Sequence, residues 1–347
     1  MRGIVDLATF RRLARLVKPA IGHAQPLHAA VRLQLASASG VDLAAQNGAL
    51  HIVARGPATV GLEGGAIVPG NALLRFIESA DGDEVRLVRN EQQLEISAGT
   101  AALSLHVYEA ATWVPIDRPT DLRTIDKQAV QALGRVLFAA SRDAQHPILQ
   151  GVRLDGRHAY ATDRRRIARV EVDADLPPCT VPGEALHIVI READENLQVG
   201  RTSTAIIFIS GTCRWQIQLL AGDYPNLAPH LGHRPAHSVR IEKTALLAAL
   251  HRMGVFDAHQ SAVFCEVSLG SVRIRADDPE LGAIEESLDC ESTFAGVVCF
   301  NLQVLCEAVE AASADLVNIE LDEPTKPAII RSEAFTQLVM PRQVPSP

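Results

Sequence analysis

Hydrophobic and polar positions along this chain follow two periods, one typical of helices and one of strands. The two periods recur in the same order three times. A helical stripe opens each third of the chain, as in residues 6–18, where Phe10, Leu13 and Val17 are apolar. Asp6 is the predicted N-cap of this first helix, and Pro19 ends it. The same spacing predicts opening helices over residues 126–142 and 242–256, and second helices over residues 70–80, 183–194 and 301–313.

Segments of alternating polarity lie between these helices and predict strands. They include residues 31–35, 102–106, 151–155, 215–219 and 272–275. The order helix, strands, helix, strands therefore appears three times. It is typical of an α+β protein whose helices lie on one face of antiparallel sheets.

A repeated segment shows how this pattern is organised. Residues 66–73 read AIVPGNAL and residues 179–186 read CTVPGEAL. The two lie about a third of the chain apart, too far for a solenoid unit, so they indicate a repeated domain. Proline-bearing stretches near residues 115–119 and 225–235 are the natural junctions. We therefore predict three domains, over residues 1–117, 118–240 and 241–347.

The composition is that of a soluble globular protein, with 47% hydrophobic and 21% charged residues. No apolar run approaches the ~18 residues that span a bilayer, and the first residues lack a signal-peptide core. We expect a cytoplasmic protein. Six cysteines without a CxxC pair predict reduced thiols, with neither a disulfide framework nor a zinc site. No metal or cofactor is expected.

The charge pattern is informative about nucleic acid. The net charge of −8 argues against a surface that coats nucleic acid, but it allows basic residues on one face. Arg11, Arg15 and Lys18 recur on one side of the first helix, and Lys127, Arg135 and Arg142 lie near one another on the second opening helix. On the pattern alone, ordinary solvated helix faces explain these residues more often than a binding surface does.

Four short motifs make the chain resemble the bacterial sliding clamp, the beta subunit of DNA polymerase III. Residues 161–168, ATDRRRIA, are similar to the family's ATDGHRLA segment, and residues 222–225, GDYP, resemble the turn that joins its second and third domains. Phe300-Asn301 resembles the start of the last helix, and residues 338–341, LVMP, resemble the C-terminal strand. The resemblance covers essentially the whole chain.

The resemblance implies a homodimeric, head-to-tail ring of six domains around double-stranded DNA. The pore is lined by helices, so the implied DNA contacts are Arg11, Arg15, Lys18, Lys127, Arg135 and Arg142. Contacts of Lys and Arg with phosphates are independent of base sequence and permit sliding. The implied interface between subunits comprises Arg75, Leu103, Leu105, Val255, Phe256, Glu285 and Glu286. Val255 and Phe256 would equally well end a buried helix.

The family also implies a client groove between the second and third domains. There the DNA polymerase III catalytic subunit, the clamp loader and other clients insert a short motif. The implied groove residues are Leu149, Thr162, Arg164, Arg166, Ile167, Pro225, Asn301, Val304, Leu338, Met340 and Pro341. An apolar slot suits Leu or Phe anchors, and Met adapts to varied ligands. Without the resemblance, such residues are more often core.

Several departures from the family motifs fall at this groove. Arg164 stands where the family has glycine, Arg165 where it has histidine, and Ala228-Pro229 where an arginine pair is usual, with His230 following. Val304 replaces a larger wall residue, and the tail reads MPRQVPSP over residues 340–347. Residues 22–26 and 146–148 lack the usual DNA-contacting side chains. The alternative hypothesis is that the chain is a divergent paralogue, a viral clamp or an inhibitor-resistant variant with a reshaped pocket.

An enzyme is the competing class of function. No HExxH, Walker A or GxSxG motif is present, and the histidines are scattered. Asp163 beside three arginines could suggest phosphate chemistry, but a salt-bridged turn explains the cluster more simply. We therefore expect a non-enzymatic processivity factor without catalytic residues.

Overall fold

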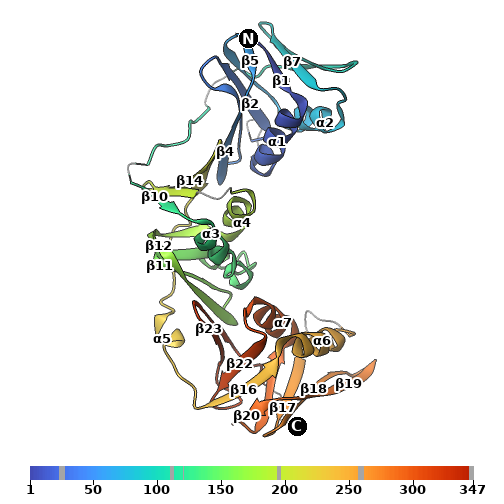
Figure 1. The fold of residues 1–347 in the computed structure, drawn as a ribbon, viewed down its shortest axis with the longest axis vertical. Helices are drawn as coiled ribbons and strands as arrows, with labels where there is room; N and C mark the ends of the chain where they lie inside the picture. The colour runs from blue at the N-terminus through green and yellow to red at the C-terminus, as the bar shows by residue number, and fades with distance from the viewer. Residues whose placement is uncertain (23–27, 110–112, 120, 194–196, 257–261, 344–347) are drawn as a thin grey trace. The chain divides into compact units, whose positions relative to one another are not determined.

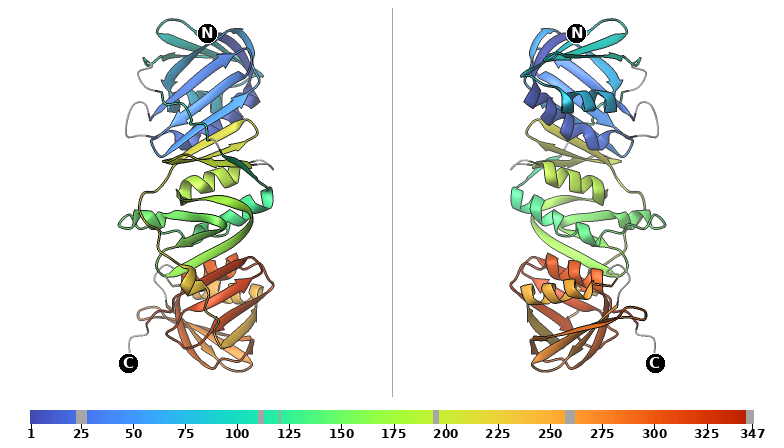
Figure 2. Two further views of the ribbon diagram at one scale, coloured as in Figure 1. Left: turned by 90° about the vertical axis from the view of Figure 1, so that its left-hand side faces the viewer. Right: turned by 90° about the vertical axis from the view of Figure 1, so that its right-hand side faces the viewer.

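The computed structural model describes residues 1–22, 28–109, 113–119, 121–193, 197–256 and 262–343 (Figures 1 and 2). They form two compact units. Unit 1 combines residues 1–130 with residues 184–219, and unit 2 combines residues 131–183 with residues 220–347. Each unit is therefore built from two stretches of chain that are distant in sequence.

The described part of the chain contains seven α-helices and three short 3-10 helices. The α-helices are α1 (Leu7–Val17), α2 (Gly70–Ser79), α3 (Lys127–Gly134), α4 (Gly183–Glu192), α5 (Ala228–Leu231), α6 (Lys243–Met253) and α7 (Leu302–Ala311). The 3-10 helices are η1 (Lys18–Ala20), η2 (Leu137–Ala139) and η3 (Pro147–Gln150). None of the described helices is long and apolar enough to cross a membrane.

Unit 1 contains two antiparallel sheets. The five-stranded sheet has the order β5-β1-β7-β8-β9 and consists of β1 (Arg2–Asp6), β5 (Thr59–Leu62), β7 (Glu84–Arg89), β8 (Gln93–Ala98) and β9 (Ala101–His106). The eight-stranded sheet has the order β10-β13-β14-β15-β4-β3-β2-β6. Its strands are β2 (Ala30–Ala36), β3 (Gly40–Gln46), β4 (Leu50–Gly56), β6 (Gly64–Pro69), β10 (Leu122–Ile125), β13 (Leu197–Arg201), β14 (Ala205–Ser210) and β15 (Cys213–Gln218).

Unit 2 also contains two antiparallel sheets. The seven-stranded sheet, of order β11-β12-β24-β23-β22-β16-β20, consists of β11 (Gly151–Thr162), β12 (Arg166–Pro182), β16 (His237–Glu242), β20 (Glu291–Ser292), β22 (Leu316–Leu321), β23 (Ala328–Ser332) and β24 (Phe335–Val339). The four-stranded sheet, of order β19-β18-β17-β21, consists of β17 (Ala262–Val267), β18 (Ser271–Asp278), β19 (Gly282–Asp289) and β21 (Gly296–Asn301). The predicted α+β class is confirmed.

Sequence signals at the helix ends explain where the opening helices begin. The Asp6 carboxylate accepts a hydrogen bond from the Thr9 amide at 2.7 Å, and Glu242 caps α6 in the same way through the amides of Thr244 and Ala245. Inside α1 the apolar stripe is buried, and α1 packs against α2 and β4. Helices α6 and α7 pack together in unit 2 (Figure 2).

The predicted opening helix over residues 126–142 is wrong in its length. Helix α3 ends at Gly134, and the chain continues through a 3-10 turn in which the Arg135 amide donates to the Ala132 carbonyl at 3.0 Å. Glycine is a poor helix former, by about 1 kcal/mol relative to alanine, so the apolar spacing continues beyond the point where the helix stops.

Both copies of the repeated segment have the same local structure. Residues 66–69 end β6, and α2 begins at Gly70, while β12 ends at Pro182 and α4 begins at Gly183. A Cβ atom at position 70 would lie 2.9 Å from the Ala29 carbonyl oxygen, so only glycine allows this close approach. The repeat is therefore a strand-to-helix junction, and the division into three domains stays a prediction.

Candidate functional site

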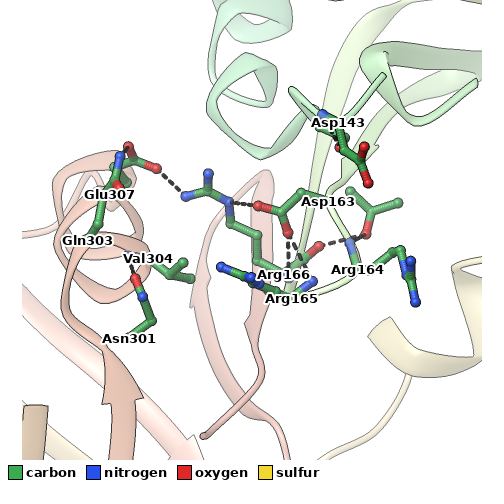
Figure 3. Close-up of polar contacts among 11 residues, drawn as sticks. Asp143, Asp163, Arg164, Arg165, Arg166, Asn301, Gln303, Val304 and Glu307 are labelled. Carbon is green, nitrogen blue, oxygen red and sulfur yellow. Dashed lines mark hydrogen bonds and ion pairs between the residues drawn. The ribbon is translucent and has the colours of Figure 1, made fainter. Parts of the chain in front are cut away.

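The turn between β11 and β12 is held by its own polar side chains (Figure 3). Asp163 Oδ1 accepts hydrogen bonds from the amides of Arg165 and Arg166, at 2.9 and 3.0 Å. The buried Thr162 hydroxyl donates to the Arg166 carbonyl at 2.7 Å and accepts from the Arg164 amide at 3.2 Å. This network fixes the directions in which the three arginine side chains leave the turn.

Arg164 has an unusual backbone conformation. Its φ of 76° makes it the single non-glycine residue with positive φ in the described part of the chain. The sliding-clamp motif has glycine at this position, and the backbone keeps the left-handed conformation that glycine adopts most easily. The Arg164 side chain is exposed, and its Nη1 lies 2.6 Å from His146 Nε2. Arg164 therefore places a cation at a backbone position that favours glycine.

We expect Arg164→Gly to be more stable than Arg164→Ala by about 1 kcal/mol, because both lack the guanidinium but only alanine retains the strained Cβ at positive φ. Thermal unfolding of the two variants measures the difference. Equal melting temperatures would mean that the turn does not hold its left-handed conformation in solution.

Arg166 connects this turn to α7. Its Nε donates to Asp163 Oδ2 at 2.9 Å, and its Nη1 donates to Glu307 Oε2. The guanidinium carbon also lies 5.0 Å from the centre of the Phe138 ring. Only 11% of the Arg166 side chain is exposed. The arginine is therefore a buried structural link, and its guanidinium is already occupied by two carboxylates.

The beginning of α7 lies beside this link. Asn301 caps the helix by accepting a hydrogen bond from the Val304 amide at 3.0 Å. Gln303, in the first turn of the helix, donates to the carboxylate of Glu307 one turn further along at 2.9 Å, which orients that carboxylate toward Arg166. Val304 is buried in the core cluster formed around α6 and α7. The structure thus places Asn301 and Val304 close to the Arg166 link (Figure 3).

A small apolar cluster lies next to the turn. Ile167 of β12 and Leu338 of β24 are register partners and are both buried. They share a cluster with five residues outside the predicted site, namely Leu227, Leu231, Ile329, Tyr160 and Tyr224. Burial raises the pKa of the Tyr224 phenol, whose hydroxyl donates to the Gly151 carbonyl at 3.4 Å. The i, i+4 spacing of Leu227 and Leu231 was the available sequence signal.

The other residues that the resemblance assigned to the groove differ in exposure. Met340 is 41% exposed, and its amide donates to the Arg165 carbonyl at 2.8 Å. Pro225 is exposed, Pro341 is half-buried, and Leu149 is buried in η3. A cavity of about 500 Å³ beside the turn is lined by Ser141, Arg142, Asp143, Asp163, Arg164 and Arg165. Residues 344–347 of the predicted tail lie outside the described residues, as do residues 23–27 near the predicted DNA loop.

The six basic residues predicted to face DNA divide into two groups. Arg15, Lys18, Lys127 and Arg142 are exposed, and Lys18 forms an exposed ion pair with Glu78 at 2.8 Å. Arg11 instead donates to the carbonyls of Ile77 and Ala80 at the end of α2.

Arg135 is likewise held by intramolecular contacts. Its Nη2 donates to the Ala311 carbonyl at 3.3 Å, and its guanidinium lies 4.3 Å from the centre of the Phe335 ring. Burial lowers the pKa of Arg135.

The residues predicted to join subunits lie at two sheet edges. Leu103 and Leu105 belong to β9, an edge strand of unit 1, and Glu285 and Glu286 belong to β19, an edge strand of unit 2. Arg75 is exposed on α2. Val255 is 68% exposed, whereas Phe256 packs partly against the core. Glu286 is engaged by Arg252 through two hydrogen bonds of 2.7 and 2.5 Å, which lower its pKa.

Nothing in the described residues resembles a metal centre, since no group of His, Cys, Asp and Glu there could hold an ion. Burial raises the pKa of the Cys265 thiol to about 12 and that of the Cys306 thiol to about 11. Buried thiols of this kind are poor nucleophiles and poor ligands.

The chain is similar to known proteins along most of its length. The family described as DNA polymerase III beta subunit, C-terminal domain, matches residues 233–343. The beta sliding clamps of Staphylococcus epidermidis and Staphylococcus aureus are each 23% identical to the chain over 300 residues, which make up 80% of this chain and 80% of theirs.

Solved structures extend the similarity of fold to almost every residue. The sliding clamp from Bartonella birtlesii bound to griselimycin has a TM-score of 0.93 at 19% identity, covering 99% of this chain and 100% of that one. The beta subunit from the DNA polymerase of Streptococcus pyogenes has a TM-score of 0.92 at 21% identity, with the same coverage. The resemblance seen in the sequence is therefore confirmed: residues 233–343 match the C-terminal domain of the DNA polymerase III beta subunit, and the chain has the fold of the bacterial sliding clamps.

Proposed function

We propose that this chain is a DNA sliding clamp, a non-enzymatic and cytoplasmic processivity factor in which two copies close a ring around double-stranded DNA. The observation that carries this proposal is the similarity of fold to sliding clamps over 99% of the chain. Strands β9 and β19 each lie at the edge of a sheet in the described part of the chain, and their outer backbone groups are the ones that a second copy would use in a head-to-tail contact. The residues proposed to contact DNA are then Arg15, Lys18, Lys127 and Arg142. Arg11 and Arg135 instead donate hydrogen bonds to carbonyl groups at helix ends.

A charged substitution at the proposed subunit contact tests the ring. We expect wild-type protein to have a dimeric mass at micromolar concentration and to stay on closed circular DNA, and Val255→Asp to lose both properties because it places a carboxylate at the contact. Analytical ultracentrifugation and gel filtration with closed and linearised plasmid measure the two effects. Leu269→Asp is the matched control. Leu269 is 74% exposed, like Val255 it is apolar, and it lies in the turn that follows β17, outside the proposed subunit contact. A monomeric wild-type protein that leaves closed circles would refute the ring.

The groove of unit 2 is the proposed docking site for DNA polymerase III, the clamp loader and other clients. Its floor is formed by Ile167 and Leu338, and Met340 is the exposed apolar residue at its rim. Burial of one Leu or Phe anchor contributes roughly 1.5–3 kcal/mol, so two anchors give a weak complex that clients can exchange. The divergent-clamp reading is the second candidate, and the Arg164 cation beside the 500 Å³ cavity favours it.

A peptide with the sequence Gln-Leu-x-Leu-Phe distinguishes the two candidates. A working client groove is expected to bind it with a Kd near 1 μM, about −8 kcal/mol, and Met340→Ala to weaken binding by about tenfold. Fluorescence polarisation measures both values, with Leu269→Ala as the control. Absence of binding by the wild type, restored in Arg164→Gly, would identify a groove reshaped by Arg164.

A further inference from the structure

A second cavity lies in unit 1, on the face of the eight-stranded sheet that points away from α1. Along β4 the side chains of Ile52 and Ala54 enter the core, whereas His51, Val53 and Arg55 point to the opposite face. The segment from Trp113 to Arg118 runs along this face, and the Asp117 amide donates to Gln216 of β15 at 2.7 Å. The cavity is open to solvent on one side, and its volume of about 760 Å³ is within the range of small-molecule sites.

The cavity is strongly cationic although the chain as a whole is acidic. Its lining includes four arginines, Arg32, Arg55, Arg118 and Arg214. Among the described residues of the lining, one is acidic, Asp42. Asp42 accepts hydrogen bonds of 2.6 and 2.9 Å from Arg55 and is thereby neutralised. Arg32 contacts the Gln34 amide oxygen at 3.3 Å, a neutral partner. The other arginines leave a concentration of positive charge that attracts anions.

A buried imidazole faces the same cavity. His51 is only 7% exposed, and its Nε2 has no hydrogen-bond partner within the described part of the chain. Its ring meets the half-buried Trp113 ring edge to face, with 5.7 Å between centroids. Leaving a buried polar atom of this kind unsatisfied is costly. Cations, an unsatisfied nitrogen and an indole ring thus meet in one cavity.

We propose that this cavity binds a nucleotide through its phosphate groups, with the base against Trp113. Guanidinium groups present paired N–H donors that match phosphate oxygens, and Trp offers a flat surface on which any base stacks. The phosphates lie nearest Arg32 and Arg214, which both line the cavity and lie in one row across the sheet, with the paired residues Ala44 and Val53 between them. This site is separate from the groove of unit 2 and does not depend on the clamp function.

Isothermal titration of the full chain with ATP and with pyrophosphate tests the proposal. ATP is expected to bind with a micromolar Kd, and the double variant Arg32→Gln/Arg214→Gln is expected to weaken both ligands by about 100-fold. Trp113→Leu is expected to weaken ATP by about tenfold while leaving pyrophosphate unchanged, because pyrophosphate has no base to stack. Arg86→Gln, on an exposed position of β7 outside the cavity, is the matched control.

The outcomes separate the possible sources of the phosphate. A single-stranded oligonucleotide that binds in place of ATP, and is lost in the double variant, would identify a nucleic acid strand as the source of the nucleotide. No heat with ATP, pyrophosphate or oligonucleotide at about 1 mM, a concentration that reveals even weak sites, would overturn the proposal. Binding that survives in the double variant, with its melting temperature unchanged, would also overturn it.

Discussion

Replacing Arg166 with alanine is expected to lower the free energy of unfolding of unit 2 by about 3 kcal/mol, the lower end of the range for breaking a buried ion pair. The change leaves the carboxylates of Asp163 and Glu307 facing each other without their cation, in a place where both are mostly buried. It also removes the guanidinium from the Phe138 ring. Urea denaturation, with hydrogen exchange of the β24 and α7 amides to locate the loss, measures the effect.

The neighbouring arginine provides the control for this prediction. Arg165 has an exposed side chain next to Arg166 in the same turn, and Arg165→Ala is expected to change stability by less than about 0.5 kcal/mol. The double variant Arg166→Ala/Glu307→Gln provides a second comparison. It removes one of the two unpaired charges, so it should recover part of the lost free energy of unfolding. If the two alanine variants unfold at the same urea concentration, the link between the turn and α7 is not formed in solution.

Acidification is expected to destabilise unit 1 through His51. Burial, with a smaller contribution from the Arg32 charge, lowers the pKa of His51 from 6.5 to about 4. In the unfolded chain His51 is therefore protonated below about pH 6.5, whereas in the folded chain it is protonated only below about pH 4. Stability is full above the unfolded pKa and falls as the pH drops through this window, by about 3 kcal/mol at its lower end. Melting temperatures measured from pH 8 to pH 4 follow the loss.

Two histidine variants isolate this effect from the titration of carboxylates. His51→Gln removes the buried imidazole and is expected to flatten the profile between pH 6.5 and pH 4. His187→Gln removes an exposed imidazole of α4 and is expected to follow the wild type. A wild-type profile as shallow as that of His51→Gln would show that water reaches the buried ring.

Local sequence signals predicted the elements well because their causes are local. The Asp6 and Glu242 caps, the strand-to-helix junctions at Gly70 and Gly183, and the alternating strands each depend on a few adjacent residues. The extent of α3 was predicted wrongly because apolar spacing alone does not register the cost of Gly134.

Contacts between distant residues could not be predicted from the sequence. Arg166 and Glu307 are 141 positions apart, and nothing in the chain pairs them. Arg135 lies on the predicted basic face, but the helix ends one residue before it and its guanidinium turns to Ala311 and Phe335. Leu227 precedes the four-residue helix α5 and Leu231 ends it, so their i, i+4 spacing is a single pair and too weak a signal to assign them to a site. Motif similarity singled out Ile167 and Leu338, which the structure pairs, but it gave no indication of the other residues in their cluster.

The continuity of the eight-stranded sheet has a consequence for how such a chain can be divided. Strand β4 lies within the first predicted domain and β15 within the second, yet the two are paired from Leu50–Ile217 to Ala54–Cys213. A fragment cut at the predicted boundary near residue 117 would expose the backbone donors and acceptors of both strands, which invites aggregation. The eight-stranded sheet takes four strands from each of the first two predicted domains, so neither of these two stretches of chain holds the complete sheet by itself.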